Sequence, residues 1–211
     1  MRPRRRNFVV VGNLEVEQVL KHSIFTDAQC IGWIGTRGEG KTESLITYLG
    51  VREPRVLAFD SFGSFTGIRL VDSIETALED LQRFEVACRR RVQPEFSSDT
   101  HAYAEHAFKL IIECLRNCLV VLEELSLWTE PKITRRLRKL IIQGRQIGVR
   151  LLLVAQQVSL IPYELQSQMT HIVVFHLHRP ADLDALERWV GKRIRKIVNR
   201  LDRFECVVVK L

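Results

Sequence analysis

The sequence predicts an α/β fold with a mostly parallel central sheet and helices on both faces. Short apolar segments, each long enough for one strand, alternate along the chain with longer segments of helical periodicity. The apolar segments lack regular polar alternation, which is typical of strands buried on both faces. Residues 35–42 read G-x-x-x-x-G-K-T between a predicted strand and a predicted helix, and in that context this pattern binds phosphate groups.

The predicted strands are short apolar runs, in part β-branched. They cover residues 28–34, 55–59, 87–92, 118–122, 149–155, 171–177 and 204–209. The predicted helices cover residues 41–49, 73–83, 102–116, 133–143 and 181–200, the last with a break at Gly191. Since the carboxyl ends of parallel strands meet at one edge of a sheet, a ligand is expected at that edge.

The length of 211 residues suffices for a substantial core, and no repeat or linker divides the chain. We therefore expect one domain over residues 28–211, preceded by a basic arm and lead-in segment over residues 1–27, with 1–6 mobile. No apolar run approaches the ~20 residues that a membrane helix needs, and the start lacks the features of a signal peptide. We expect no transmembrane segment, no secretion, and reduced cysteines for the five scattered Cys residues.

Positive charge is in excess, with a formal net charge of +7. An acidic partner is therefore expected, and nucleic acid is the first candidate. Most of the excess comes from four clusters: Arg2 with Arg4, Arg5 and Arg6; Arg89, Arg90 and Arg91; Arg135, Arg136, Arg138 and Lys139; and Lys192, Arg193, Arg195 and Lys196.

The phosphate-loop pattern predicts a nucleoside triphosphate site. Its glycines allow several backbone N–H groups to point at one anion, and the helix that follows adds its positive end. Lys41 is expected to reach the β- and γ-phosphates, and the Thr42 hydroxyl to ligate Mg²⁺. The predicted nucleotide-binding residues are Gly35, Thr36, Arg37, Gly38, Glu39, Gly40, Lys41, Thr42 and Glu43.

Two carboxylates, Glu123 and Glu124, end the predicted strand at 118–122. This arrangement suits a nucleotide hydrolase, in which the first acid orients the water shell of Mg²⁺ and the second activates the attacking water as general base. Glu123 is one methylene longer than the Asp more common at this place, so an indirect contact with Mg²⁺ is expected.

Polar residues also end the strand at 149–155. Gln156 can donate to a γ-phosphate oxygen while accepting from water, which suits a residue that senses the γ-phosphate. Arginines upstream of this strand cannot readily fold back to their own phosphate loop. Arg145, with Arg150 as second choice, is therefore predicted to act in a neighbouring subunit as an arginine finger.

The segments GTRGEGKT, LVVLEE, QGRQIGVRLLLVAQQVSLIP and HIVVFHLHRPADLDAL together resemble the FtsK–HerA superfamily of DNA-pumping ATPases. The resemblance covers nearly the whole chain from residue 28, and it is to the compact members, the genome-packaging ATPases of membrane-containing icosahedral viruses. It implies a RecA-like core, a homo-oligomeric ring, most often a hexamer, with ATP at subunit interfaces, and double-stranded DNA driven through the pore.

The same resemblance assigns catalytic roles to Lys41, Glu124 and Gln156 and a metal role to Thr42. It implies ATP and Mg²⁺ as cofactors, capsid or membrane proteins at a packaging vertex as further partners, and a location in the host cytoplasm or the virion. The chain departs from the family at Glu123, where Asp is more frequent, and at Ala155-Gln156-Gln157, where cellular members often have Thr-Gln-Arg.

Other functions remain open at this point. A filamentous-phage-type assembly or export ATPase is the nearest, although such proteins usually carry a membrane segment. A small P-loop phosphotransferase commonly closes an Arg-rich lid over its acceptor, and residues 89–91 could be mistaken for one, but the Glu123-Glu124 strand end favours water as the acceptor. A DNA-binding scaffold without hydrolysis is a third. Asp60-Ser61-Phe62-Gly63 spells a GTPase D-x-x-G, but no guanine-reading motif follows, and His176 and His178 lack an acidic partner at ligand spacing, so no metal site is expected there.

Overall fold

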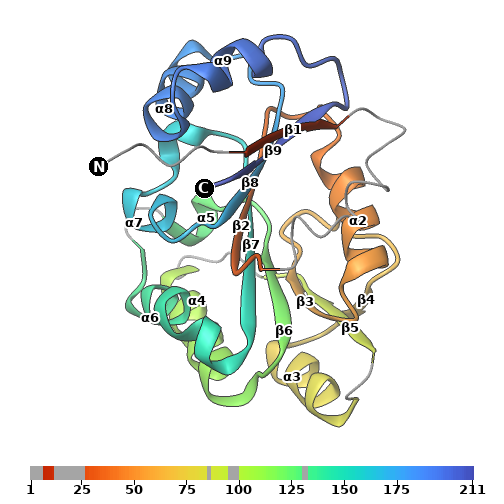
Figure 1. The fold of residues 1–211 in the computed structure, drawn as a ribbon. Coiled ribbons are helices and arrows are strands. Elements are labelled where there is room, and N and C mark those ends of the chain that lie inside the picture. Colours follow the sequence, from red (N-terminus) through yellow and green to blue (C-terminus); the bar gives the residue numbers. More distant parts are fainter. Residues whose placement is uncertain (1–6, 12–26, 85–86, 95–99, 130–132) are drawn as a thin grey trace.

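The computed structural model describes residues 7–11, 27–84, 87–94, 100–129 and 133–211. Within them the strands form one nine-stranded sheet of order β1-β9-β8-β2-β7-β6-β3-β5-β4 (Figure 1). The run from β8 to β4 is parallel, whereas β9 is antiparallel to both β8 and β1. The strands are β1 (Asn7–Val11), β2 (Cys30–Ile34), β3 (Arg55–Phe59), β4 (Arg69–Val71), β5 (Cys88–Val92), β6 (Cys118–Leu122), β7 (Val149–Ala155), β8 (His171–Phe175) and β9 (Cys206–Lys210). The predicted α/β class with a mostly parallel sheet is confirmed.

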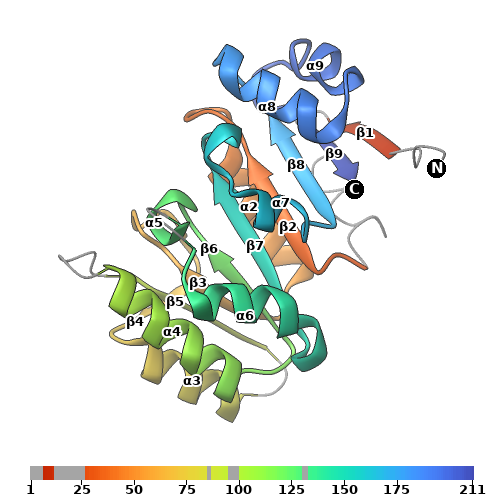
Figure 2. The ribbon, with the colours of Figure 1, turned by 90° about the vertical axis from the view of Figure 1, so that its left-hand side faces the viewer.

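Helices cover both faces of this sheet (Figures 1 and 2). One face packs against α2 (Lys41–Arg52) and the segment after β3. The opposite face packs against α3 (Ile74–Arg83), α4 (Thr100–Cys114), α5 (Ser126–Thr129), α6 (Arg135–Gln143), α7 (Tyr163–Gln166), α8 (Pro180–Val190) and α9 (Arg193–Val198). Short 3₁₀ helices, η2 (Gly144–Ile147) and η3 (Val158–Leu160), flank β7.

The central strands are largely apolar because successive side chains enter two different cores. In β7, Leu151 and Leu153 join the core under α4 and α6, whereas Leu152 and Val154 join the core under α2. Since a strand places alternate side chains on opposite faces, a continuous apolar run requires cover on both.

The helix boundaries have local causes. Ser73 caps α3 by accepting a hydrogen bond from the Thr76 amide at 3.1 Å, and Thr134 caps α6 in the same way from Leu137 at 3.0 Å. Gly191, at φ 107°, separates α8 from α9, so the predicted break in the last helix is confirmed. The sequence did not predict β4, α5 or α7.

The beginning of the chain contributes to the sheet. Residues 7–11, within the predicted lead-in segment, form β1 and pair with β9 from Asn7↔Lys210 to Val11↔Cys206. The predicted mobile arm at 1–6 lies outside the described residues. In the described part of the chain, no helix combines the length and the apolar character needed to cross a membrane.

Candidate nucleotide-binding site

A cleft of about 650 Å³ opens at the carboxyl ends of the neighbouring strands β2, β7, β6 and β3. The predicted phosphate loop, the two predicted acids and the predicted sensor all border it. Its lining consists of Arg37, Gly38, Gly40, Lys41, Thr42, Glu43, Phe62, Ser64, Glu123, Glu124, Val154, Gln156 and Phe204. The topology therefore brings together side chains that the sequence separates by more than one hundred positions.

The phosphate loop connects β2 to α2, and two of its glycines are needed for its shape. Gly38 and Gly40 adopt φ values of 88° and 87°, a left-handed region that is costly for residues with a side chain. At Gly40 a Cβ would also lie 2.5 Å from Cδ1 of Phe204. The loop is thus held open at the start of α2, where helix N–H groups are free to meet an anion.

The start of the loop is bonded to the two strands beside β2. The Gly35 amide donates to the Ala155 carbonyl of β7 at 3.2 Å, and the Thr36 amide donates to the His176 carbonyl at 3.2 Å. A Cβ on Gly35 would lie 2.6 Å from Cβ of Phe175. These contacts fix the position of the loop relative to the ends of β7 and β8.

Lys41 is buried at the first position of α2, with 8 % of its surface exposed. Its Nζ donates to the Thr36 carbonyl at 2.7 Å, across the loop. Burial lowers the pKa of Lys41 to about 8, although the charges of Glu124 and Glu39 partly oppose the change. A bound phosphate would place a negative charge beside this buried ammonium group and so stabilise its charged form.

Glu124 follows β6 and already has two hydrogen-bond partners in the cleft. Gln156, at the end of β7, donates through Nε2 to Glu124 Oε2 at 2.5 Å, and the Ser126 hydroxyl donates to Oε1 at 2.8 Å. Glu124 also has a positive φ of 53°. A non-glycine residue in this conformation raises the free energy of the folded state, and such residues cluster at functional sites. The conformation of Glu124 is therefore consistent with a functional role for its carboxylate.

Glu123 points to a different partner, Asp60 at the end of β3. Burial raises the pKa of Glu123 to about 7, and a hydrogen bond and repulsion from Asp60 add to the effect. Burial opposes ionisation of Asp60 as well, but its hydrogen bonds with Glu123, the Phe65 and Ser64 amides and Arg91 lower its pKa. The two carboxyl groups therefore share one proton near neutral pH, with the proton on Glu123 and the negative charge on Asp60.

Asp60 is a structural anchor of this corner. It is fully buried, accepts hydrogen bonds from the Ser64 and Phe65 amides at 2.7 and 3.0 Å, and forms an ion pair with Arg91 at 2.7 Å. The D-x-x-G pattern noted in the sequence therefore begins with an acid that follows the end of β3, close to the site. The pairing with Arg91 is not that of a GTPase switch acid exposed to a phosphate.

The donor set fits a magnesium ion. Thr42 and Glu123 both line the cleft and both offer oxygen atoms, the ligand type that Mg²⁺ prefers. Glu123 would have to give up its shared proton and turn from Asp60 to contact the ion directly, which agrees with the indirect contact expected from its length.

The structure keeps the two candidate finger arginines apart from the cleft of their own chain. Arg145 lies exposed in η2, at the amino end of β7, whereas Gln156 follows the carboxyl end of the same strand. Arg150 forms an ion pair with the buried Glu53, which also accepts from the Tyr48 hydroxyl at 2.9 Å. A role of either arginine in a neighbouring subunit stays a prediction.

One basic cluster of the sequence is internal. The side chains of β5 alternate between partners inside the chain: Arg89 donates to the Glu53 carbonyl at 2.8 Å, Arg90 pairs with Asp80, and Arg91 pairs with Asp60. These guanidinium groups are therefore engaged within the fold, Arg90 and Arg91 by carboxylates and Arg89 by backbone carbonyls, and they do not form an Arg-rich lid. The clusters on α6 and α9 keep exposed members, such as Arg135, Lys139, Lys192 and Lys196.

Two aromatic residues at the cleft were not expected. Phe62 is exposed beside Glu124, and Phe204 packs its ring on Gly40 from a left-handed conformation of φ 71°. The Arg203 guanidinium lies 4.8 Å from the centre of the Phe204 ring. No motif marks either residue, because their place depends on how the loops fold over the end of the sheet.

A comparison with protein-family models finds no match, and a comparison with curated protein sequences finds none either. Solved structures do match the fold. The genome-packaging NTPase B204 from Sulfolobus turreted icosahedral virus 2, in complex with AMPPCP, aligns with a TM-score of 0.70 at 15 % identity over 86 % of this chain and 91 % of that one. B204, the DNA-packaging ATPase from Sulfolobus turreted icosahedral virus, aligns with a TM-score of 0.64 at 14 % identity over 87 % and 97 %.

A more distant match is VirB4 of Thermoanaerobacter pseudethanolicus, with a TM-score of 0.55 at 10 % identity over 83 % of this chain and 84 % of that one. The viral structures include complexes with AMPPCP and ATP-gammaS. At these identities the likeness is one of fold. The chain therefore has the P-loop NTPase fold that these viral packaging NTPases and VirB4 share.

Proposed function

We propose that this chain is a Mg²⁺-dependent ATPase of the FtsK–HerA superfamily that moves double-stranded DNA, and that it packages a viral genome into a preformed capsid. The observation that carries the proposal is the single cleft where Lys41, Thr42, Glu123, Glu124 and Gln156 meet. These residues come from three separate segments, the phosphate loop, the end of β6 and the end of β7, and their convergence is what hydrolysis of a triphosphate requires.

The geometry supports water as the phosphoryl acceptor. Hydrolysis breaks the bond between the γ-phosphorus and the bridging oxygen, and the attacking water must lose a proton. Glu124 is oriented by Gln156 and Ser126 and is free to accept that proton. Lys41 would bind the β- and γ-phosphates. Mg²⁺, held through Thr42 and Glu123, would neutralise charge on the phosphate oxygens.

DNA and a ring of identical subunits are supported by two independent features. The exposed basic residues of α6 and α9 supply positive charge for the DNA backbone. The described part of the chain holds no arginine in the cleft other than Arg37 of the loop itself, so a finger from a neighbouring subunit would complete the site.

The test is ATP hydrolysis by the purified chain, measured with and without duplex DNA at low and high salt. Turnover should rise with DNA, and the stimulation should fade as salt increases, since contacts of Arg and Lys with phosphates act through counterion release. Lys41→Ala and Glu124→Gln should abolish turnover, whereas the controls Lys109→Ala and Glu79→Gln, exposed on α4 and α3, should retain it.

The same assay distinguishes the proposed ATPase from a phosphotransferase and from a DNA-binding scaffold. Equal turnover with and without duplex DNA would refute translocation, and transfer of phosphate to a nucleoside in place of water would favour a phosphotransferase. A chain that binds ATP without hydrolysing it would favour a DNA-binding scaffold. The structure bears on one of these alternatives, because Arg90 and Arg91, which could be mistaken for part of a phosphotransferase lid, are paired inside the fold.

A further inference from the structure

Three side chains with metal-binding chemistry meet beside the phosphate loop. Glu39 belongs to the loop, whereas His176 and His178 belong to the segment after β8, and 139 positions separate Glu39 from His178. None of the three lines the nucleotide cleft. The two histidines have no acidic partner at ligand spacing along the sequence, but the fold supplies Glu39 from a distant part of the chain.

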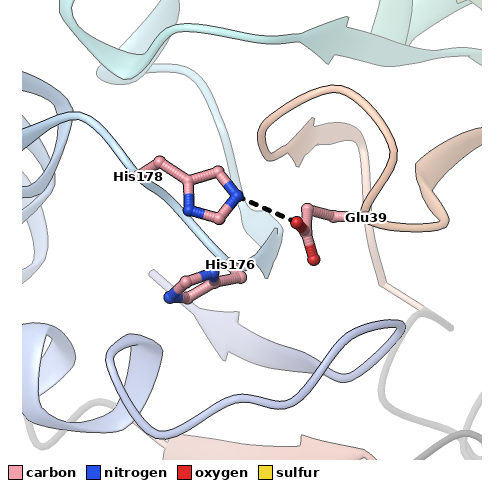
Figure 3. Close-up of side chains that lie close together, drawn as sticks. All are labelled: Glu39, His176 and His178. Atoms are coloured by element: carbon pink, nitrogen blue, oxygen red, sulfur yellow. Dashed lines mark hydrogen bonds and ion pairs between the residues drawn. The ribbon is translucent and has the colours of Figure 1, made fainter.

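The three groups are close enough to share one ion. Their possible ligand atoms all lie within 4.8 Å of one another. His178 Nε2 lies 3.0 Å from Glu39 Oε1, and the two imidazole rings stand nearly perpendicular with their centres 4.5 Å apart (Figure 3). Ligands of a tetrahedral Zn²⁺ at about 2.0 Å are about 3.3 Å apart, so small side-chain rotations would bring all three into place.

The backbone prepares this arrangement. The segment after β8 leaves Leu177 buried while His176 and His178, on either side of it, have neighbouring rings, with His178 directed at Glu39 (Figure 3), as alternation in an extended chain favours. The segment is also bonded to the loop, since the Thr36 amide donates to the His176 carbonyl at 3.2 Å and the His178 amide donates to the Thr36 hydroxyl at 3.3 Å. The backbone segments that carry the ligands are therefore held together before any ion arrives.

The donor set favours a transition metal over magnesium. Two imidazoles and one carboxylate suit Zn²⁺, Ni²⁺ or Cu²⁺, whereas Mg²⁺ prefers oxygen ligands alone. The Glu39 side chain is 12 % exposed and that of His178 is 53 % exposed, so the carboxylate is partly shielded while the site stays open to solvent. Three protein ligands and one open position for water are typical of accessible zinc sites.

We propose that Glu39, His176 and His178 bind one divalent transition-metal ion, best matched by Zn²⁺, at a site separate from the Mg²⁺–nucleotide cleft. The ion would add a link between the phosphate loop and the end of β8, which hydrogen bonds already join. The proposal does not depend on the proposed function, since it concerns residues outside the cleft.

A simple ion pair between Glu39 and His178 is the competing explanation for the contact. It needs only those two residues and gives no role to His176. A metal site needs all three, and it predicts that His176 contributes as much to binding as His178. The two explanations therefore separate through variants of His176.

The experiment is a titration of the untagged full chain, stripped with a chelator, with Zn²⁺ by calorimetry and with Co²⁺ by visible absorption. One equivalent should bind with micromolar affinity or tighter, and millimolar Mg²⁺ should not displace it. His176→Ala and His178→Ala should each weaken binding at least about tenfold. Saturating Zn²⁺ should also raise the melting temperature of the wild type by a few degrees, and that of the variants less.

Two conservative variants separate the loss of a metal ligand from a failure to fold. His178→Gln retains an amide that can donate to Glu39 but removes the imidazole ligand, and Glu39→Gln keeps the shape of the side chain; both should lose the tight site even if His178→Ala does not fold. His106→Ala, which removes an exposed histidine paired with Glu75 on the other side of the sheet, should bind as the wild type does. Unchanged Zn²⁺ affinity in His176→Ala, a Co²⁺–thiolate band from cysteines, or no binding at all would overturn the proposal.

Discussion

Gln156 Nε2 lies 2.5 Å from Glu124 Oε2, so the end of β7 and the end of β6 are joined across the candidate catalytic cleft. The amide has one further N–H and its oxygen to offer, whereas the carboxylate keeps a free lone pair on each oxygen. A nucleotide that draws the amide toward its γ-phosphate would therefore also reorient the carboxylate. We therefore expect this contact to couple the presence of the γ-phosphate to the orientation of the proposed general base.

Replacing the Gln156 amide should slow hydrolysis more than it weakens binding. Gln156→Leu keeps the size of the side chain but leaves Glu124 with one partner, Ser126, and we expect turnover to fall by about 10²-fold while the ATP dissociation constant changes little. Gln157→Leu is the matched control, since its side chain pairs with Arg179 instead. Single-turnover hydrolysis and nucleotide titration separate the two effects, and a parallel loss of binding would contradict this role.

Replacing the two candidate finger arginines by alanine should have different effects, on turnover for Arg145 and on stability for Arg150. Arg145 is exposed, so Arg145→Ala should leave stability unchanged and reduce turnover by about 10³-fold or more if the group acts on a neighbouring subunit. Arg150→Ala would leave Glu53 buried without its ion-pair partner, at a cost of about 3 kcal/mol in the free energy of unfolding.

Mixing subunits tests whether Arg145 acts in trans. Lys41→Ala subunits lack a working phosphate loop but keep Arg145, so they should restore activity to Arg145→Ala subunits in mixed assemblies. Full activity of Arg145→Ala alone, or no recovery on mixing, would remove Arg145 from the site.

Strong local signals in the sequence predicted most of the sheet and the cleft. The runs that became β2 and β6 are apolar throughout and that of β7 is apolar except for Arg150, and the polar residues that follow them lie at one edge because parallel strands all finish there. Edge elements were missed for a physical reason: β4 has only three residues, and β1 is identified by its pairing with β9 at the far end of the chain.

Pairings between distant residues were beyond prediction from the sequence. The run Arg89-Arg90-Arg91 reads as a charged surface, yet each member finds a partner supplied by another segment. The partnership of Glu123 with Asp60 and that of Glu39 with His178 arise in the same way. A single sequence shows which charged residues are present, but it does not show which of them are in contact in the fold.

Nucleotide binding should take up protons near pH 8. Burial lowers the pKa of Lys41 to about 8 in the free protein, so part of the population has a neutral amine at that pH. Bound phosphates favour the charged form and raise the pKa. Affinity should therefore be constant below pH 7 and fall as the pH rises above 8. Calorimetry in two buffers with different ionisation enthalpies measures the proton uptake, which Lys41→Met should abolish.

Stability should depend on pH through Glu123. Its pKa is about 7 in the folded chain against an ordinary value of 4.5, so the folded state holds the proton over a range where the unfolded state has lost it. Stability should then fall as the pH rises from 4.5 to 7. Asp60 has a lowered pKa, and its contribution is lost only below its ordinary value of 3.8, outside this window.

Glu123→Gln should flatten this part of the pH profile. The amide keeps a donor toward Asp60 and does not ionise, so the variant should gain about 1–3 kcal/mol relative to the wild type between pH 5 and pH 8. Urea unfolding at both pH values measures the difference, with Glu79→Gln as a control at an exposed position. Equal pH slopes in wild type and Glu123→Gln would show that the pair does not share a proton.

Gly38 and Gly40 form a matched pair for testing how tightly the phosphate loop is enclosed. Both have φ near 88°, so backbone strain should destabilise the folded state by a similar amount, about 1 kcal/mol, when either is replaced by alanine. Of the two, Gly40 is the crowded one. A Cβ added there would lie 2.5 Å from the Phe204 ring, whereas a Cβ added at Gly38 would meet nothing within 4 Å.

Gly40→Ala should therefore lower the free energy of unfolding by about 1–3 kcal/mol more than Gly38→Ala does. Removing the ring should recover part of that difference, because Phe204→Ala opens the space that the new methyl group needs. A double-mutant cycle of urea unfolding on Gly40→Ala and Phe204→Ala should give a coupling of at least about 0.5 kcal/mol, and the same cycle with Gly38→Ala should give none. Additive effects in both cycles would mean that Phe204 does not close over the loop in solution.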